Sequence, residues 1–125
     1  MRISQLALGL LLVAQPLTHA QNATFTTGYC GGFLLRASGL IQEQSMRPGS
    51  DRESMVLIEK ALMNAGTLLM LRSASDGTGV RDGDRAAAYA VSELGKSYLP
   101  LLDKTKPVHH MAMGCLAYAN EVVKK

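Results

Sequence analysis

The two cysteines of the chain, Cys30 and Cys115, constrain its fold more than any other feature of the sequence. A disulfide between them would close a loop that spans most of the chain. The chain-entropy model gives such a bridge about 4.5 kcal/mol of stabilisation through the unfolded state. No CxxC or CxxCH motif accompanies these residues. The sequence therefore predicts one structural disulfide, with a metal site or two free thiols as the alternatives.

Residues 1–20 have the pattern of a secretory signal peptide. Arg2 supplies the positive charge, an unbroken apolar run follows, and small residues stand at Thr18 and Ala20. We expect cleavage after Ala20, which leaves residues 21–125 as a single helical domain that is periplasmic or secreted. The apolar run has roughly half of the ~20 residues that a membrane-spanning helix needs. An uncleaved anchor is therefore the less favoured alternative.

Length and composition exclude several classes of protein. The chain has 125 residues, of which 47% are hydrophobic, and this allows one globular domain with one core. Lys and Arg total 13 against 10 Asp and Glu, and the resulting charge of +3 is too small and too scattered to indicate nucleic-acid binding. Asn22 begins a glycosylation sequon, which has meaning only in a eukaryotic source.

Apolar residues recur at helical spacing in four segments, and no segment alternates like a strand. We expect an all-α, small antiparallel four-helix bundle, in which the first and last helices are neighbours joined by the Cys30–Cys115 disulfide. A capping box, Ser50 to Glu53, precedes the second helix. The predicted helices cover residues 28–46, the apolar run 55–71 that follows the capping box, 84–99 with Asp82 or Asp84 as its cap, and 106–123 capped by Thr105.

The pattern within the helices predicts which faces are buried. Residues 55–71 are apolar almost all round, so this helix is expected to be the central and most buried one, while Glu59, Lys60 and Asn64 argue against a membrane span. The third helix carries apolar residues at Ala87, Val91, Leu94 and Tyr98. The first helix contains three glycines that weaken it, and close packing against a neighbour explains them best: Gly31, Gly32 and Gly39.

The segment 72–83 is rich in Gly, Ser and Asp, and we expect it to be a surface loop. Its spacing does not fit an EF-hand, because Ala87 stands where the bidentate Glu is required and Arg81 where the Gly is required. Loops on a rigid scaffold often carry recognition residues. The charged residues here are therefore the candidates for partner binding: Asp76, Arg81, Asp82 and Asp84.

The last helix contains a run of residues that could bind copper. Imidazole, thioether and thiol groups together suit Cu(I). Since the thiol of Cys115 is expected in the disulfide, the candidates are His109, His110, Met111 and Met113. Adjacent histidines diverge by about 100° on a helix, so one site cannot easily use both. A haem between a Met and a His is a further alternative, without an attachment motif.

No motif for nucleophilic catalysis is present: GxSxG, HExxH and Ser-x-x-Lys are all missing. We therefore expect a non-enzymatic protein-binding module, such as an immunity protein, an inhibitor, an adaptor or a chaperone-like factor. Its partner is another protein of unknown identity. The alternatives are a copper or small-ligand carrier that uses the last helix, and a hydrolase whose residues the sequence does not reveal.

Overall fold

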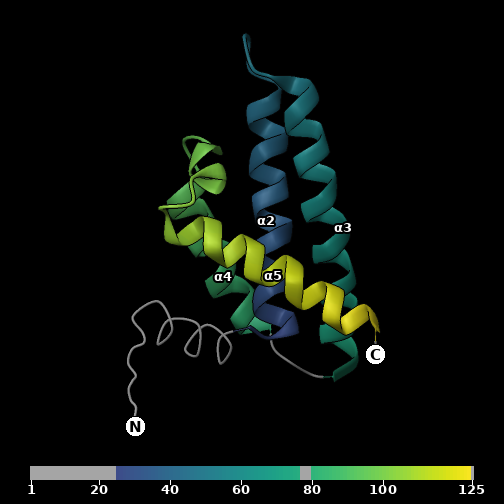
Figure 1. Cartoon of the computed structure of the whole chain (residues 1–125). Helices are drawn as coiled ribbons and strands as arrows, with labels where there is room; N and C mark the ends of the chain where they lie inside the picture. Colours follow the sequence, from purple (N-terminus) through teal and green to yellow (C-terminus); the bar gives the residue numbers. More distant parts are fainter. Residues whose placement is uncertain (1–24, 77–79, 125) are drawn as a thin grey trace, which may run out of the picture.

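A computed structural model describes residues 25–76 and 80–124. These residues form helices and contain no strand, which confirms the all-α prediction (Figure 1). The predicted signal peptide, its cleavage site and Asn22 lie outside the described residues. The elements are α2 (Thr27–Ser45), α3 (Arg52–Asp76), α4 (Val80–Leu94), the 3-10 helix η1 (Leu99–Leu102) and α5 (Pro107–Lys124).

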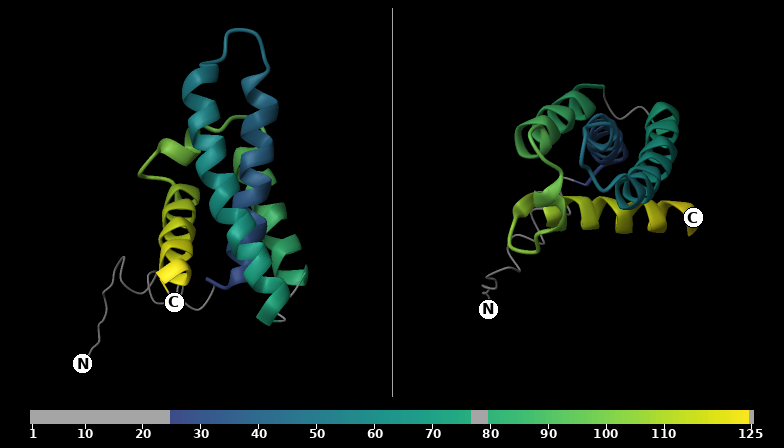
Figure 2. Two further views of the ribbon diagram at one scale, coloured as in Figure 1. Left: turned by 90° about the vertical axis from the view of Figure 1, so that its right-hand side faces the viewer. Right: turned by 90° about the horizontal axis from the view of Figure 1, so that it is seen from above.

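Helix α2 lies at the centre of the molecule, with α3 on one side and α4 on the other (Figure 2). The chain turns back between α2 and α3, so these two helices are antiparallel, whereas α4 runs in the same direction as α2. Helix α5 crosses α2 obliquely and reaches α3 with its C-terminal half (Figure 1). The core contains apolar side chains from all four long helices and from η1.

The central position of α2 corrects the prediction that residues 55–71 form the most buried helix. Helix α2 has buried residues along its whole length, from Thr27 to Ser45. Helix α3 buries one face, and the apolar side chains of that face are Met55, Leu62 and Leu69. Apolar character all round a helix permits burial on every side, but only neighbouring helices can supply it. No other described helix covers the outer side of α3 (Figure 2).

Two glycines of α2 allow its neighbours to approach closely. A Cβ on Gly32 would lie 2.6 Å from the Cα of Gly83 in α4, and a Cβ on Gly31 would lie 2.8 Å from the side chain of Met70 in α3. The close-packing explanation is therefore confirmed for these two glycines. It is wrong for Gly39, whose added Cβ would meet only the side chain of Arg36, at 3.8 Å.

Helix α4 begins and ends earlier than predicted. It starts at Val80, and its buried stripe consists of Gly83 and three further residues, Ala86, Ala90 and Leu94. The predicted stripe is wrong at Val91, which is 42% exposed. Small residues form most of the true stripe because α4 lies close against α2, and such residues contribute little to a pattern of large apolar side chains.

The predicted disulfide is present between Cys30 and Cys115, with Cα atoms 5.2 Å apart and a sequence separation of 85. It joins the first turn of α2 to the middle of α5, and both residues are fully buried. The Thr26 side chain accepts a hydrogen bond from the backbone N–H of Tyr29 and caps α2. The bridge and the cap fix the beginning of the described chain.

The start of α3 differs in detail from the predicted capping box. Asp51 is the capping residue, because its side chain accepts a hydrogen bond from the Ser54 N–H. The Ser50 hydroxyl donates instead to the carbonyl oxygens of Ser45 and Arg47. Ser50 therefore stabilises the turn between α2 and α3, and the carboxylate one residue later stabilises the helix end.

Candidate functional site

The outer face of α3 carries two strongly exposed leucines. Leu57 and Leu71 are each 68% exposed. Monomeric soluble proteins rarely leave a row of such residues on one helix face uncovered, and such rows mark interaction surfaces. This face is the candidate site because nothing in the fold requires these positions to be apolar.

Among the described residues, α3 is also the one helix whose length and composition would allow it to cross a membrane. Residues 52–74 contain an 18-residue window with a mean hydropathy of 1.3. Only 22% of that window is buried, so burial in the core does not explain its apolar character. The property is weak evidence for a membrane, but it again distinguishes α3 from the other helices.

The exposed residues of α3 form a stripe, here called the α3 stripe, with alternating intervals of four and three residues. All of its members are exposed except Leu68, which is half-buried. The α3 stripe consists of Leu57, Ala61, Asn64, Leu68 and Leu71. Helical geometry places residues at these intervals on one side of a helix, opposite its buried face.

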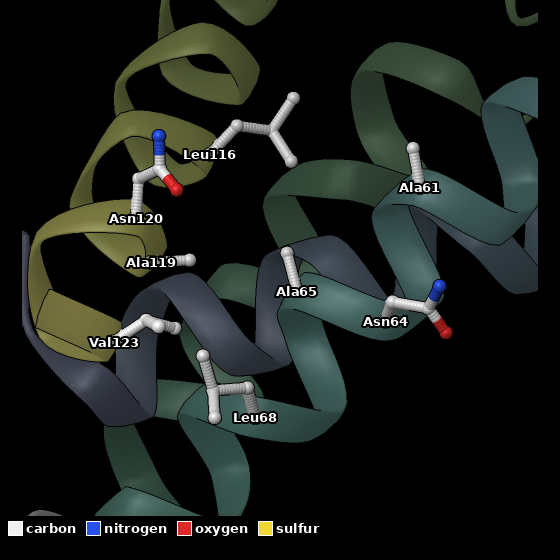
Figure 3. Close-up of a pocket in the computed structure, with 8 residues that line it drawn as sticks. All are labelled: Ala61, Asn64, Ala65, Leu68, Leu116, Ala119, Asn120 and Val123. Carbon is white, nitrogen blue, oxygen red and sulfur yellow. The ribbon is translucent and has the colours of Figure 1, made fainter.

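A groove of about 420 Å³ lies between α3 and α5, and three members of the α3 stripe line it: Ala61, Asn64 and Leu68 (Figure 3). The residues of its floor are small, with Ala65 on α3 facing Ala119 on α5. Leu116 and Val123 extend from α5 along its other wall, and Val123 is 59% exposed. The groove is open to solvent and is therefore suited to a side chain or a helix rather than to an enclosed small molecule.

The side chains that line the groove are of the kinds that bind a partner. The described residues that line it are apolar apart from two amides, Asn64 on α3 and Asn120 on α5 (Figure 3). Amides donate and accept hydrogen bonds but do not titrate near neutral pH. The lining therefore supplies apolar contact and two orienting hydrogen-bonding groups, and none of its described residues is a nucleophile or general base.

The predicted partner-binding residues do not form a loop on the scaffold. Asp76 is the last residue of α3, while Arg81, Asp82 and Asp84 belong to the first turns of α4. The loop prediction for 72–83 is therefore wrong over most of its length, because both helices extend into it. Local Gly and Asp content favours a loop, but contact with α2 keeps the start of α4 helical.

The charged groups at this end of α4 are exposed. Asp82 pairs with Arg85 at 2.5 Å, and their side chains are 32% and 66% exposed. An ion pair at such a surface contributes about 1 kcal/mol or less. Arg81 and Asp84 are also exposed, so a partner could reach them. Their role in binding stays a prediction.

Three aromatic residues belong to the two helices α2 and α4: Tyr29, Phe33 and Tyr89. The rings of Phe33 and Tyr89 have centroids 6.0 Å apart. Burial raises the pKa of Tyr89, and the charge of Glu93 raises it further. Burial also raises the pKa of Tyr29, although the positive charge of Arg85 opposes this effect. Both phenols therefore stay protonated through the neutral range and act as packing groups.

The two histidines stabilise the turn that precedes α5. His109 Nδ1 lies 2.8 Å from the carbonyl oxygen of Leu101, and His110 Nε2 lies 2.8 Å from that of Lys104. Because a carbonyl can only accept, each of these ring nitrogens carries a proton and donates. One nitrogen of each imidazole is thus engaged in holding the turn.

The predicted copper ligands are only partly brought together. The His109 and His110 rings are 5.2 Å apart, and the Met111 sulfur lies 3.9 Å from the sulfur of Cys115, which belongs to the disulfide. Met113 is 46% exposed. Within the described residues, no group of three or more His, Cys, Asp or Glu side chains is placed to hold a metal. Copper binding stays a prediction.

Comparison with protein-family models, with curated proteins and with solved structures gives no match for this chain. Sequence reasoning missed the α3 stripe because it assigned α3 to the core. The signal that could have found it is the second set of apolar residues on α3, at heptad spacing and opposite the buried set.

Proposed function

We propose that this protein is an exported protein-binding module and that the α3 stripe, with the adjoining groove, is its binding surface. The observation that carries the proposal is the exposure of Leu57 and Leu71 on a helix that buries only one face. Covering such side chains contributes about 25 cal/mol per Å² of apolar surface removed from water. A partner that presents an apolar helix would fit the open groove best.

The disulfide supports the exported location. A buried Cys30–Cys115 bridge is typical of proteins that fold in oxidising compartments. Together with the signal-peptide pattern of residues 1–20, it favours the periplasm or the extracellular space. Processing can be tested directly: mass spectrometry of the exported protein should give Gln21 as its first residue, and a mature chain that retains residues 1–20 would contradict this part of the proposal.

Photo-crosslinking tests the binding surface. A photoreactive amino acid replaces Leu71 on the α3 stripe, and the control variant carries it at Leu102, which is 52% exposed on η1. We expect crosslinks to a protein from position 71 and none from position 102. Adding Leu57→Glu should remove the crosslink from position 71, because the charge would face the apolar partner. Equal crosslinking from both positions, or no effect of Leu57→Glu, would contradict the proposal.

A further inference from the structure

Helix α5 contributes less to the core than the other three long helices do. Its buried residues are small or of medium size: Val108, Ala112, Cys115 and Ala119. Larger side chains that are fully buried come from the other three helices, and they are Phe33, Leu34, Ile41, Leu62, Leu69 and Leu94. Figure 2 shows α5 along one side of the unit that α2, α3 and α4 form. This unit therefore contains most of the buried apolar surface without α5.

The helices α2, α3 and α4 hold one another through contacts in which α5 takes no part. A Cβ on Gly66 of α3 would lie 3.0 Å from the backbone nitrogen of Leu35 in α2. Gly32 of α2 and Gly83 of α4 bring those two backbones equally close. Many domains of about 60 residues fold alone. We therefore expect these three helices to stay folded when α5 is displaced.

Two features hold α5 in place, at different points along its length. The two histidines hold its first turn through their hydrogen bonds to backbone carbonyl oxygens. The disulfide between Cys30 and Cys115 holds its middle. Beyond Cys115, Ala119 is the one buried residue among those of α5 that the structure describes. The C-terminal half of α5 is thus fixed to the core mainly by one covalent bond.

We propose that the Cys30–Cys115 disulfide is a redox-sensitive latch. Its reduction releases the C-terminal half of α5 from α3, with the histidine-held turn as the pivot, while α2, α3 and α4 stay folded. The reductant is a dithiol, such as the active-site pair of a thiol–disulfide oxidoreductase. In this inference the bridge not only stabilises the fold but also controls the position of one helix.

The reaction is a thiol–disulfide exchange. A thiolate of the dithiol attacks one sulfur of the bridge, forms a mixed disulfide with it and displaces the other cysteine as a thiolate. The second thiol of the reductant then attacks the mixed disulfide and releases the first cysteine. In total the bridge takes up two electrons and two protons and becomes two thiols, while the dithiol gives them up and becomes a disulfide.

The bridge is shielded, so attack by a thiolate requires an opening beside it. Both cysteines are fully buried. The sulfur of Met111, one turn earlier on α5, lies 3.9 Å from the sulfur of Cys115, and Met111 is partly exposed to solvent. The ring of Phe25 covers the neighbouring residue Gly114, at the place where a Cβ would stand. We therefore expect Met111 to slow the approach of a reductant from its side of α5.

Release of α5 would also dismantle the groove, because Leu116 and Val123 form its wall on the α5 side (Figure 3). Reduction should therefore weaken binding of a partner at that surface. This consequence rests on the proposed function, whereas the latch itself does not.

Hydrogen–deuterium exchange with mass spectrometry, before and after treatment of the protein with dithiothreitol, tests the latch. An isolated helix of this length is marginal in water. After reduction we therefore expect residues 112–124 to exchange within tenfold of the rate of an unfolded chain. Peptides of α2 and α4 should still exchange at least a hundredfold more slowly than that chain. Loss of protection in all helices together, or protection of residues 112–124 equal to that of α2, would overturn the proposal.

A double variant without the bridge serves as the control for the reductant. Cys30→Ser with Cys115→Ser should give the exchange pattern of the reduced wild type, and dithiothreitol should not change it further. A change on adding dithiothreitol to this variant would show that the reductant acts elsewhere, and the latch would be wrong.

The rate of reduction tests the shield, with alkylation of the free thiols as the measurement. Met111→Ala should speed reduction by dithiothreitol at least threefold, because it removes the thioether beside Cys115. Met113→Ala is the matched control, since this methionine is 46% exposed and lies two residues further along α5. It should be reduced at the wild-type rate. Equal rates for the two variants would contradict the role given to Met111.

The latch and the proposed function can fail separately. If position 71 gives no crosslink in the oxidised protein, the proposed function is wrong, and the exchange pattern still decides the latch. If position 71 crosslinks to a partner equally well before and after reduction, although α5 is released, the latch is correct and the α5 wall takes no part in binding.

Discussion

The backbones of α2 and α4 meet at Gly32 and Gly83, where a Cβ on Gly32 would lie 2.6 Å from both the Cα and the carbonyl oxygen of Gly83. Real Cβ atoms do not approach backbone so closely, and backbone cannot move aside as a flexible side chain can. The contact also explains why α2 is central. Glycine on α2 lets α4 lie close on one side, while α3 covers another.

Gly32→Ala should therefore be strongly destabilising, and Gly39→Ala is the matched control on the same helix. The added methyl at position 32 has to separate two backbones, so we expect a loss of about 1–3 kcal/mol or more in the free energy of unfolding. At position 39 the nearest atom is 3.8 Å away. Alanine there should stabilise the protein by about 0.5–1 kcal/mol. Urea denaturation measures both, and equal effects would contradict the assigned contact.

The buried amide of Gln44 connects the ends of α2 and α4, and its removal should destabilise the fold. Gln44 Nε2 donates a 2.7 Å hydrogen bond to the carbonyl oxygen of Leu94, and the residue is 5% exposed. Gln44→Leu leaves that carbonyl without this donor, so we expect a loss of about 1–3 kcal/mol. Gln42→Leu is a control at an exposed position two residues away on the same helix. Thermal unfolding in which the two variants match wild type would contradict this role.

Loss of the disulfide should lower the melting temperature by well over ten degrees. The bridge closes a loop of 85 residues, and such a loop contributes about 4.5 kcal/mol in the chain-entropy model. A domain of this size shifts by about 4 °C or more per kcal/mol. The double variant Cys30→Ser, Cys115→Ser tests this by calorimetry, and an unchanged melting temperature would show that helix packing alone sets the stability.

The turn before α5 should become less stable at acid pH, because the Asp103 carboxylate becomes protonated. The hydroxyl and the N–H of Thr105 both donate to the Asp103 carboxylate, and these hydrogen bonds lower the pKa of Asp103. A carboxyl whose pKa is lowered on folding contributes stability above its unfolded pKa of about 3.9, and this is lost as the pH falls through the folded value. Thr105→Val should raise the pKa of Asp103, as an NMR titration of the carboxyl carbon would show. An unchanged titration would mean that the hydroxyl has no part in it.

Periodicity predicted the four helices because they depend on local pattern, and the disulfide partners followed from the presence of two cysteines. It did not predict which helix is central. That depends on glycine contacts such as Gly31 with Met70, which join positions far apart in the sequence and leave no apolar signal. The early start of α4 has a similar explanation, since Gly83 and Ala86 are buried although neither is a large apolar residue.

The candidate site was harder to predict than the fold. Leu57 and Leu71 are as apolar as the buried Leu62 and Leu69, and a sequence does not distinguish the side of a helix that faces the core from the side that faces a partner. The charged residues near Asp82 were predicted to bind a partner because they stand out in composition. The structure pairs Asp82 with Arg85, an interaction that requires no partner protein.

The central position of α2 also determines when the core can form during synthesis of the chain. Helix α2 is the first described helix to be synthesised, and Cys30 cannot meet Cys115 until nearly the whole chain has emerged. The side chains of α2 that are buried in the folded protein, such as Phe33 and Ile41, therefore stay exposed to solvent until the later helices have been synthesised. A nascent chain of this kind exposes its future core until synthesis is nearly complete, and this is the form that holdase chaperones and proteases encounter.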